Sequence, residues 1–325
     1  MAEAAAAFKI GDIEQCININ KTLFSSEISC LELEHNRNWM KLASAHINTA
    51  FAFKLLGKFE SGATEVEAGI QLLESHYSQA KPEISHAYDL ATELEISRNN
   101  LGRAQALADK ALELKTKIYN KLELPLAHSL NLQGAIHLAQ GALDAAQVDF
   151  KKSLVVNVAN FGLARPLHQQ TAVTLSNLAG VFRTRGQHGE AAQIYEVVVT
   201  SFTAHLGEGS WIAAQAAFDL GVSLALIGEK SRATEVLVDA VSRFMTARGP
   251  EHPATLGVME FLKNLDKVEV PEGHDSRVDL VDELLNEAER EVKVLKGSAG
   301  VQGDVHVIDR RGHVGHGHPL FTPLK

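Results

Sequence analysis

Three histidines near the C-terminal end, His313, His316 and His318, come closest in this sequence to a metal site. Imidazole nitrogens two and three residues apart can bind one zinc or copper ion. No cysteine and no group of carboxylates lies nearby to complete the set of ligands. We therefore expect no metal and no other cofactor, and we keep a metal-binding tail as an alternative.

The segment that holds these histidines also has apolar side chains. Residues 297–325 are rich in glycine and histidine and show no helical periodicity, which is typical of an extended arm. Leu320 and Phe321 lie in this arm, and their burial against another protein would stabilise a contact. The composition therefore favours an arm that binds a partner protein through Leu320 and Phe321.

Sequence motifs of common enzyme classes are absent. The chain has no phosphate-binding loop, no HExxH zinc motif, no GxSxG hydrolase motif and no GxGxxG dinucleotide motif. Cys30 lies near His35, but we interpret it as a half-buried thiol in a helix. We therefore predict that the protein is not an enzyme.

Net charge indicates which class of partner to expect, and cysteine content indicates which cell compartment. The formal net charge is −9, so no basic face for nucleic acid is expected. Two cysteines in 325 residues favour a reducing intracellular compartment, mitochondrial or cytosolic. No apolar run reaches the roughly 20 residues that a membrane-spanning helix needs, and the N-terminal residues show no signal-peptide pattern.

One short pattern recurs five times at a nearly constant interval. Successive copies are 42, 42, 45 and 42 residues apart, and a fixed period of this size is the signature of a repeat array. The pattern contains a turn position, which is glycine in four copies and asparagine in one: Gly57, Asn99, Gly141, Gly186 and Gly228. Both residue types tolerate the left-handed backbone conformation that ends a helix.

Each copy predicts two helices on either side of this turn. Apolar residues at helical spacing precede and follow Gly186 in the fourth copy, and the other copies repeat the arrangement. In the third copy, the small residues Gly134 and Ala146 are expected to face each other where the two helices approach closely. The sequence therefore predicts antiparallel helix pairs.

These residues resemble tetratricopeptide repeats, specifically the 42-residue type of kinesin light chains. Residues 174–179 are similar to the start of that family's first helix, residues 186–195 to its turn and second helix, and residues 249–253 to its Gly-Pro-x-His-Pro link. The resemblance implies an all-α, right-handed superhelical solenoid of antiparallel helix pairs, with a C-terminal helix and an extended tail. It also implies that the partners are other proteins.

We predict five segments. They are a terminal half repeat at 1–37, five repeats and a final single helix at 38–268, a linker at 269–274, an amphipathic helix at 275–296 and the extended arm at 297–325. The apolar stripe of the amphipathic helix includes Val281, Leu285 and Val292. This stripe predicts either a helix that caps the last repeat or a helix that binds a partner protein.

The first helices of the repeats should line an inner surface. The positions predicted to face it and to bind a partner are Phe51, Lys54, His86, Asp89, Glu93, His128, Asn131, Arg183, Gln215 and Phe218. Acids lie among the bases, so this surface does not resemble the basic clamp with which some members of the family bind a peptide carboxylate.

The function predicted from these features is a non-catalytic scaffold. We expect a structural or accessory subunit of a large multiprotein complex, such as a mitochondrial ATP synthase or respiratory complex, with other subunits as partners. One alternative is a mobile adaptor that, like kinesin light chains, binds short peptides in its groove. A metal-binding protein that uses the histidine tail is the other.

Overall fold

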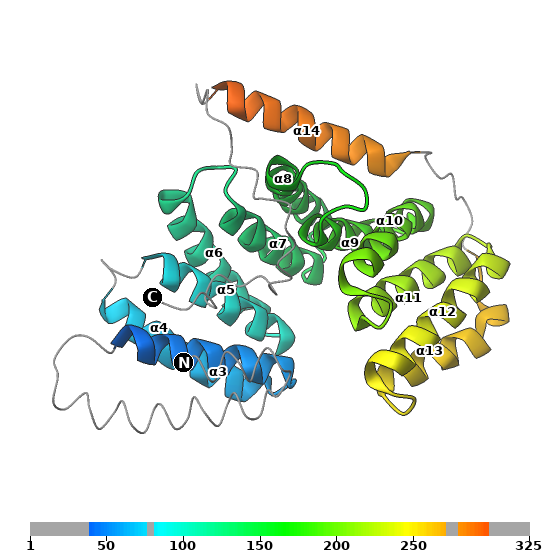
Figure 1. The fold of residues 1–325 in the computed structure, drawn as a ribbon, viewed down its shortest axis with the longest axis horizontal. Coiled ribbons are helices and arrows are strands. Elements are labelled where there is room, and N and C mark those ends of the chain that lie inside the picture. The colour runs from blue at the N-terminus through cyan, green and yellow to red at the C-terminus, as the bar shows by residue number, and fades with distance from the viewer. Residues whose placement is uncertain (1–38, 77–80, 271–278, 299–325) are drawn as a thin grey trace. The chain divides into compact units, whose positions relative to one another are not determined.

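All regular structure in the described part of the chain is helical. The computed structural model describes residues 39–76, 81–270 and 279–298, which hold twelve α-helices and one 3-10 helix (Figure 1). This all-α architecture of packed helix pairs confirms the predicted fold class. The chain divides into two compact units, with the boundary between Asn120 and Lys121.

The first unit contains the first two repeats. Its helices are α3 (Trp39–Leu55), α4 (Phe59–Ser75), α5 (Lys81–Ser97) and α6 (Leu101–Ile118). Helices α3 and α4 pack as one pair and α5 and α6 as the next. Their core contains fully buried aliphatic side chains such as Leu73 of α4 and Ile84 and Leu94 of α5.

The second unit contains the other three repeats and the helices that follow them. Its elements are α7 (Leu124–Ala139), α8 (Leu143–Phe161), α9 (Gln169–Thr184), α10 (His188–Leu206), α11 (Trp211–Leu226), α12 (Lys230–Arg248), α13 (Pro253–Lys263), the 3-10 helix η2 (Leu265–Lys267) and α14 (Leu280–Ser298). Pairs α7–α8, α9–α10 and α11–α12 are repeats three to five, and one core cluster runs through all of them.

The five predicted turn residues all adopt the left-handed conformation. Their φ angles lie between +58° at Asn99 and +85° at Gly228. At Gly186, the backbone N–H donates to the carbonyl of Arg183, and the next N–H donates to that of Phe182. These bonds use carbonyls that the end of the helix would otherwise leave unpaired, so the predicted turn positions are confirmed.

Close approach within a repeat depends on a glycine and a large side chain. A Cβ atom placed on Gly134 would lie 2.6 Å from the ring of Phe150. In the fifth copy, a Cβ atom on Gly221 would lie 2.6 Å from Leu237. We expected Gly134 to face Ala146; the atoms nearest to Gly134 belong instead to Phe150, which lies one turn further along the second helix. The small residue of the first helix therefore makes room for a bulky residue of the second.

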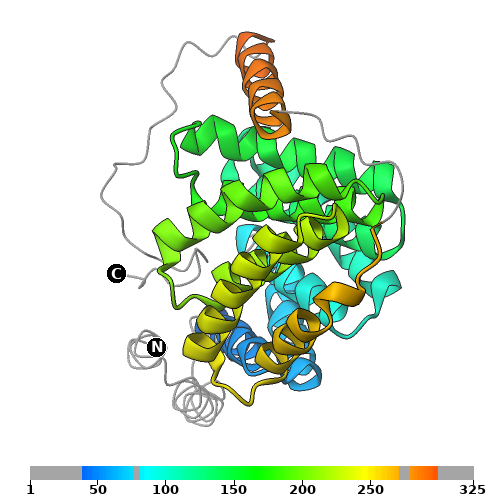
Figure 2. The same ribbon diagram turned by 90° about the vertical axis from the view of Figure 1, so that its right-hand side faces the viewer.

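Helix α14 lies on the third and fourth repeats. It contacts α8 and α10, and both views show it beside α8 (Figure 1, Figure 2). It begins at Leu280 and ends at Ser298, later than the predicted 275–296. The expectation that it caps the last repeat was wrong, because charged anchors and an apolar surface on α8 and α10 hold it there instead.

Candidate functional site

Within the first unit, two predicted inner-surface residues bind each other. Lys54 of α3 forms an ion pair with Glu93 of α5, and its ammonium lies 5.3 Å from the centroid of the Phe51 ring. Both charged side chains are largely shielded from solvent. The pair therefore connects the first helices of consecutive repeats, with Phe51 below it.

Asp89 was predicted to bind a partner, but its side chain is fully buried. It forms an ion pair with Lys115 of α6, which is also fully buried. Its neighbour on the inner surface, His86, is only 9% exposed. Two buried charges persist together because each compensates the other's loss of hydration. The structure therefore assigns Asp89 to the interior of the first unit.

A buried polar cluster joins three helices of the second unit. Asn131 of α7 donates to the hydroxyl of Thr174 on α9 at 2.8 Å, and Asn157 of α8 donates to the same hydroxyl at 2.9 Å. Ser153 of α8 donates to a backbone carbonyl of α7 at 2.9 Å. Asn131 thus holds neighbouring helices together, while His128, one turn earlier, is half-buried.

Two more predicted residues meet between α9 and α11. Arg183 forms an ion pair with Asp219 at 2.5 Å, and Gln215 donates to the same carboxylate at 3.3 Å. Nearby, burial of Tyr195 raises the pKa of its phenol, and the negative charge of Asp219 adds to the effect. This part of the surface therefore carries a fixed ion pair, and the tyrosine near it is buried and neutral.

Apolar side chains of the same two helices remain open to solvent. Val173 of α9 is 37% exposed and Trp211 of α11 is 48% exposed. The guanidinium of Arg248 lies 4.9 Å from the Trp211 ring centroid. Phe218 is half-buried, and its ring meets Phe261 of α13 edge to face, with the ring centroids 5.7 Å apart.

We call Val173, Arg183, Trp211, Gln215 and Phe218 the α9–α11 surface. It combines exposed aliphatic and aromatic area with a positioned charge pair, the composition that protein-binding surfaces favour. It offers no nucleophile with an adjacent base. Its chemistry therefore suits binding of another protein, and it is the candidate functional site.

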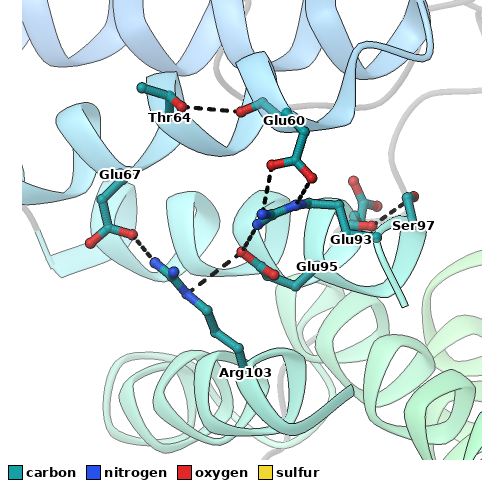
Figure 3. A network of polar contacts seen from close by, with 8 residues as sticks. Glu60, Thr64, Glu67, Glu93, Glu95, Ser97 and Arg103 are labelled. Carbon is teal, nitrogen blue, oxygen red and sulfur yellow. Dashed lines mark hydrogen bonds and ion pairs between the residues drawn. The ribbon is translucent and has the colours of Figure 1, made fainter. Parts of the chain in front are cut away.

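A network of charges that sequence reasoning missed joins the second helices of the first unit. Arg98 lies 2.6 Å from Glu60 and 2.7 Å from Glu95, and its hydrogen bond to Glu60 raises its pKa. Arg103 pairs with Glu67 and lies 3.5 Å from Glu95 (Figure 3). These contacts hold α4, α5 and α6 in register.

The same contacts recur in the second unit, so a sequence signal existed. Arg98 and Arg185 each stand one residue before a turn residue, and each pairs with an acid three residues after the preceding turn. Arg103 and Arg232 each stand four residues after a turn residue. Each pairs with a glutamate that stands ten residues after the turn residue of the preceding copy. Charge positions compared between copies would have revealed them.

The apolar stripe of α14 is used within the chain. Val281, Leu285 and Val292, predicted to bind a partner, are 3–6% exposed and belong to the core cluster of the second unit. Lys151 of α8 forms an ion pair with Glu287 of α14 at 2.8 Å. Arg165 contacts Asp282 at 2.5 Å. This corrects the prediction that the stripe faces another protein.

A histidine occupies the N-terminus of α9. The ring of His168 accepts a hydrogen bond from the backbone N–H of Gln170 at 3.3 Å and stacks on Phe161 with the centroids 3.5 Å apart. Burial lowers the pKa of His168, and the nearby ring of His205 contributes in the same direction. The helix cap therefore depends on the neutral form of His168.

The candidates in the C-terminal arm lie outside the described residues. These are His313, His316, His318, Leu320 and Phe321. Among the residues that the structure does describe, no group of three or more histidine, cysteine, aspartate or glutamate side chains is arranged to hold a metal ion. No helix in the described ranges is long and apolar enough to cross a membrane.

Comparison with known proteins supports the resemblance to tetratricopeptide repeats over one repeat of the chain. Residues 171–211, which span α9 and α10, match the tetratricopeptide repeat family. One similar solved structure is that of nearly identical TPR-like repeats of a kinesin light chain from Podosopora anserina. It is 14% identical to this chain with a TM-score of 0.52, and the match covers 66% of this chain and 99% of that one. No curated protein matches the sequence.

Two further structures share the fold. BtubC (BKLC) from P. vanneervenii is 15% identical with a TM-score of 0.51, and the match covers 78% of this chain and 94% of that one. A signal transduction ATPase with a tetratricopeptide repeat sensor, from Pyrococcus horikoshii, is 18% identical with a TM-score of 0.57, over 92% of this chain and 42% of that one. At these identities the likeness concerns the fold alone.

Proposed function

We propose that this tetratricopeptide repeat protein is a non-catalytic scaffold that binds other proteins through its α9–α11 surface. The observation that carries the proposal is the exposure of Val173 and Trp211 on the two helices that the Arg183–Asp219 pair joins. Solvent-exposed apolar area on a surface that also carries a positioned charge gains stability when another protein covers it. The ion pair to Asp219 and the hydrogen bond from Gln215 hold the polar side chains of this surface in place.

Within this function we propose a permanent structural subunit of a large multiprotein complex, inside the cell. A mitochondrial assembly such as an ATP synthase or respiratory complex is our specific candidate. The motive is the amount of apolar surface that the second unit exposes, since a lasting neighbour would cover it. The low cysteine content suits a reducing compartment.

The test is the native mass of the tagged chain isolated from its source cells. We expect a complex of fixed stoichiometry, and we expect Val173→Asp to dissociate it. The matched control is Val294→Asp, which places the same charge at a 68% exposed valine on α14. A chain recovered as a free monomer would contradict the structural-subunit proposal.

A peptide-binding adaptor is the second candidate, and the same exposed side chains of α9 and α11 favour it. A mobile adaptor would be isolated mostly free and would bind short peptides reversibly at this surface. Titration of the free chain with peptides from co-isolated proteins distinguishes the two. Saturable binding that Val173→Asp weakens, with no stable complex in the cell, would support the adaptor.

A further inference from the structure

Helix α13 is a first helix that no second helix covers in the described chain. It begins 42 residues after α11 and packs beside α12 (Figure 2). In each of the five complete copies, the first helix is covered by the second helix of its own copy. The side of α13 that corresponds to this covered side lacks such a neighbour.

The corresponding residues of α11 show what this side normally contacts. Ala214, Ala217 and Gly221 share one face of α11 at helical spacing, and the two alanines are fully buried. Gly221 allows α12 to approach so closely that a Cβ atom would lie 2.6 Å from Leu237. These three positions therefore mark the contact line between a first helix and its second helix.

On α13 the same three positions carry large side chains, and two of them line an open groove. They are Leu256, Met259 and Lys263, each 42 residues after its α11 counterpart, and Leu256 is 51% exposed. Met259 and Lys263 line the groove together with Val238 and other apolar side chains of α12. Val238 is 53% exposed. Most of the groove is thus apolar surface that faces water.

Helix α13 carries two opposite charges one helical turn apart, of which Lys263 lines the groove. Glu260 and Lys263 are both exposed, and neither forms an ion pair with another described residue. In two α13 helices that run antiparallel, Lys263 of each can lie beside Glu260 of the other. The charge pattern of α13 is therefore complementary to itself.

We propose that α13 mediates dimerisation with a second copy of this chain. Each copy's α13 takes the place of the second helix that is missing after α13 in the described part of the other copy, in the antiparallel orientation of the helix pairs. The pairing covers Leu256, Met259 and Val238 on both copies. A two-fold arrangement closes on itself, so it buries both groove surfaces without forming a filament.

Two other features of the second unit agree with this choice. Helix α14 does not cover α13, because its own apolar stripe is already buried on α8 and α10. Methionine at the centre of the groove is flexible and polarisable, which suits a contact between two identical surfaces. The dimer is independent of the α9–α11 surface, so a failure of one proposal leaves the other standing.

The first test is analytical ultracentrifugation of the full chain over a range of concentrations. We expect a monomer–dimer equilibrium, and Leu256→Glu should raise the dissociation constant at least about tenfold, because a carboxylate replaces buried apolar area at two symmetric places. Val294→Glu on α14 is the control, and its equilibrium should equal that of the unmodified chain. Circular dichroism checks that each variant keeps its helices.

The second test reverses these two charges of α13. Glu260→Lys and Lys263→Glu should each weaken the dimer, because like charges then meet across the two-fold axis. The double variant Glu260→Lys/Lys263→Glu should restore it. A chain that stays monomeric at all concentrations overturns the proposal, and so does a dimer that Leu256→Glu leaves intact. A double variant as weak as the single ones overturns the antiparallel pairing.

Discussion

We expect replacement of glycine by alanine to destabilise the protein at Gly134, where Phe150 lies close, and to stabilise it at Gly180. Gly134 lies inside α7, where an added Cβ atom would come within 2.6–2.9 Å of three atoms of the Phe150 ring. Gly180 lies inside α9, where the nearest atom to an added Cβ is a methyl carbon of Leu138 at 3.5 Å. The second distance is an ordinary van der Waals contact, and the first is a clash.

The magnitudes decide the sign of each effect. Replacing glycine by alanine inside a helix stabilises it by about 1 kcal/mol through propensity. Overpacking a buried site costs roughly 1–3 kcal/mol, and Phe150 is fully buried, so its ring has little room to move. We therefore expect Gly180→Ala to stabilise the second unit and Gly134→Ala to destabilise it.

The assay is thermal and urea unfolding of the two variants, followed by circular dichroism. A change of 1 kcal/mol should shift the midpoint of the second unit by about 2–4 °C. A double-mutant cycle with Phe150→Leu then isolates the clash, because the smaller side chain makes room for the new methyl group. We expect Gly134→Ala to cost less in the Phe150→Leu background than alone.

Two results would refute this reasoning. If Gly134→Ala and Gly180→Ala stabilise the protein equally, helix propensity decides at both sites and the close approach of α7 to α8 is not real. If the cost of Gly134→Ala is the same with leucine at position 150, the Phe150 ring is not what the new methyl group meets.

Three other predictions concern the turns, α14 and pH. Gly186→Val and Gly228→Val should each lower the free energy of unfolding by about 1 kcal/mol or more, because a β-branched residue is strained at φ values of +79° and +85°. Unchanged melting temperatures would contradict this prediction. Leu285→Ala should lower the free energy of unfolding by about 2–5 kcal/mol because Leu285 is 3% exposed. Val294→Ala, at a 68% exposed site, should change that free energy little. Equal unfolding midpoints for the two variants would mean that α14 does not pack on the repeats. Because the pKa of His168 is lower in the folded chain, His168 binds a proton more readily when the chain is unfolded, so stability should fall as pH drops below about 6.5. His168→Asn keeps a capping oxygen and should reduce the dependence of stability on pH. An unchanged pH dependence would exclude His168 as its source.

The sequence by itself determined the repeat period, the helix pairs and the turns. These are local properties: Gly57 and Asn99 stand where the backbone turns left-handed, and few other residues tolerate that conformation. The charged contacts were also within reach of the sequence, since Arg98 and Arg185 occupy the same place in their repeats. Between the second and third copies, the two corresponding positions hold Gly102 and Gln140, which carry no charge.

Only the tertiary structure decided which predicted inner-surface residues remain accessible. Asp89 and Gln215 occupy the same inner face in the repeat pattern, yet Asp89 is fully buried against Lys115 and Gln215 is exposed. The difference depends on a lysine 26 residues further along the chain, which no period of the sequence connects to Asp89. Burial is set by whatever side chain arrives from another element, and so it cannot be read from a single helix.

The place of α14 was decided in the same way. Its apolar spacing predicted a helix with one buried side but could not name the surface that buries it, because any apolar stripe of suitable shape satisfies that spacing. Lys151 and Arg165 of the second unit supply charges that match Glu287 and Asp282. Amphipathic periodicity is a property of one helix, whereas docking requires complementarity between two surfaces, and only the folded chain brings those surfaces together.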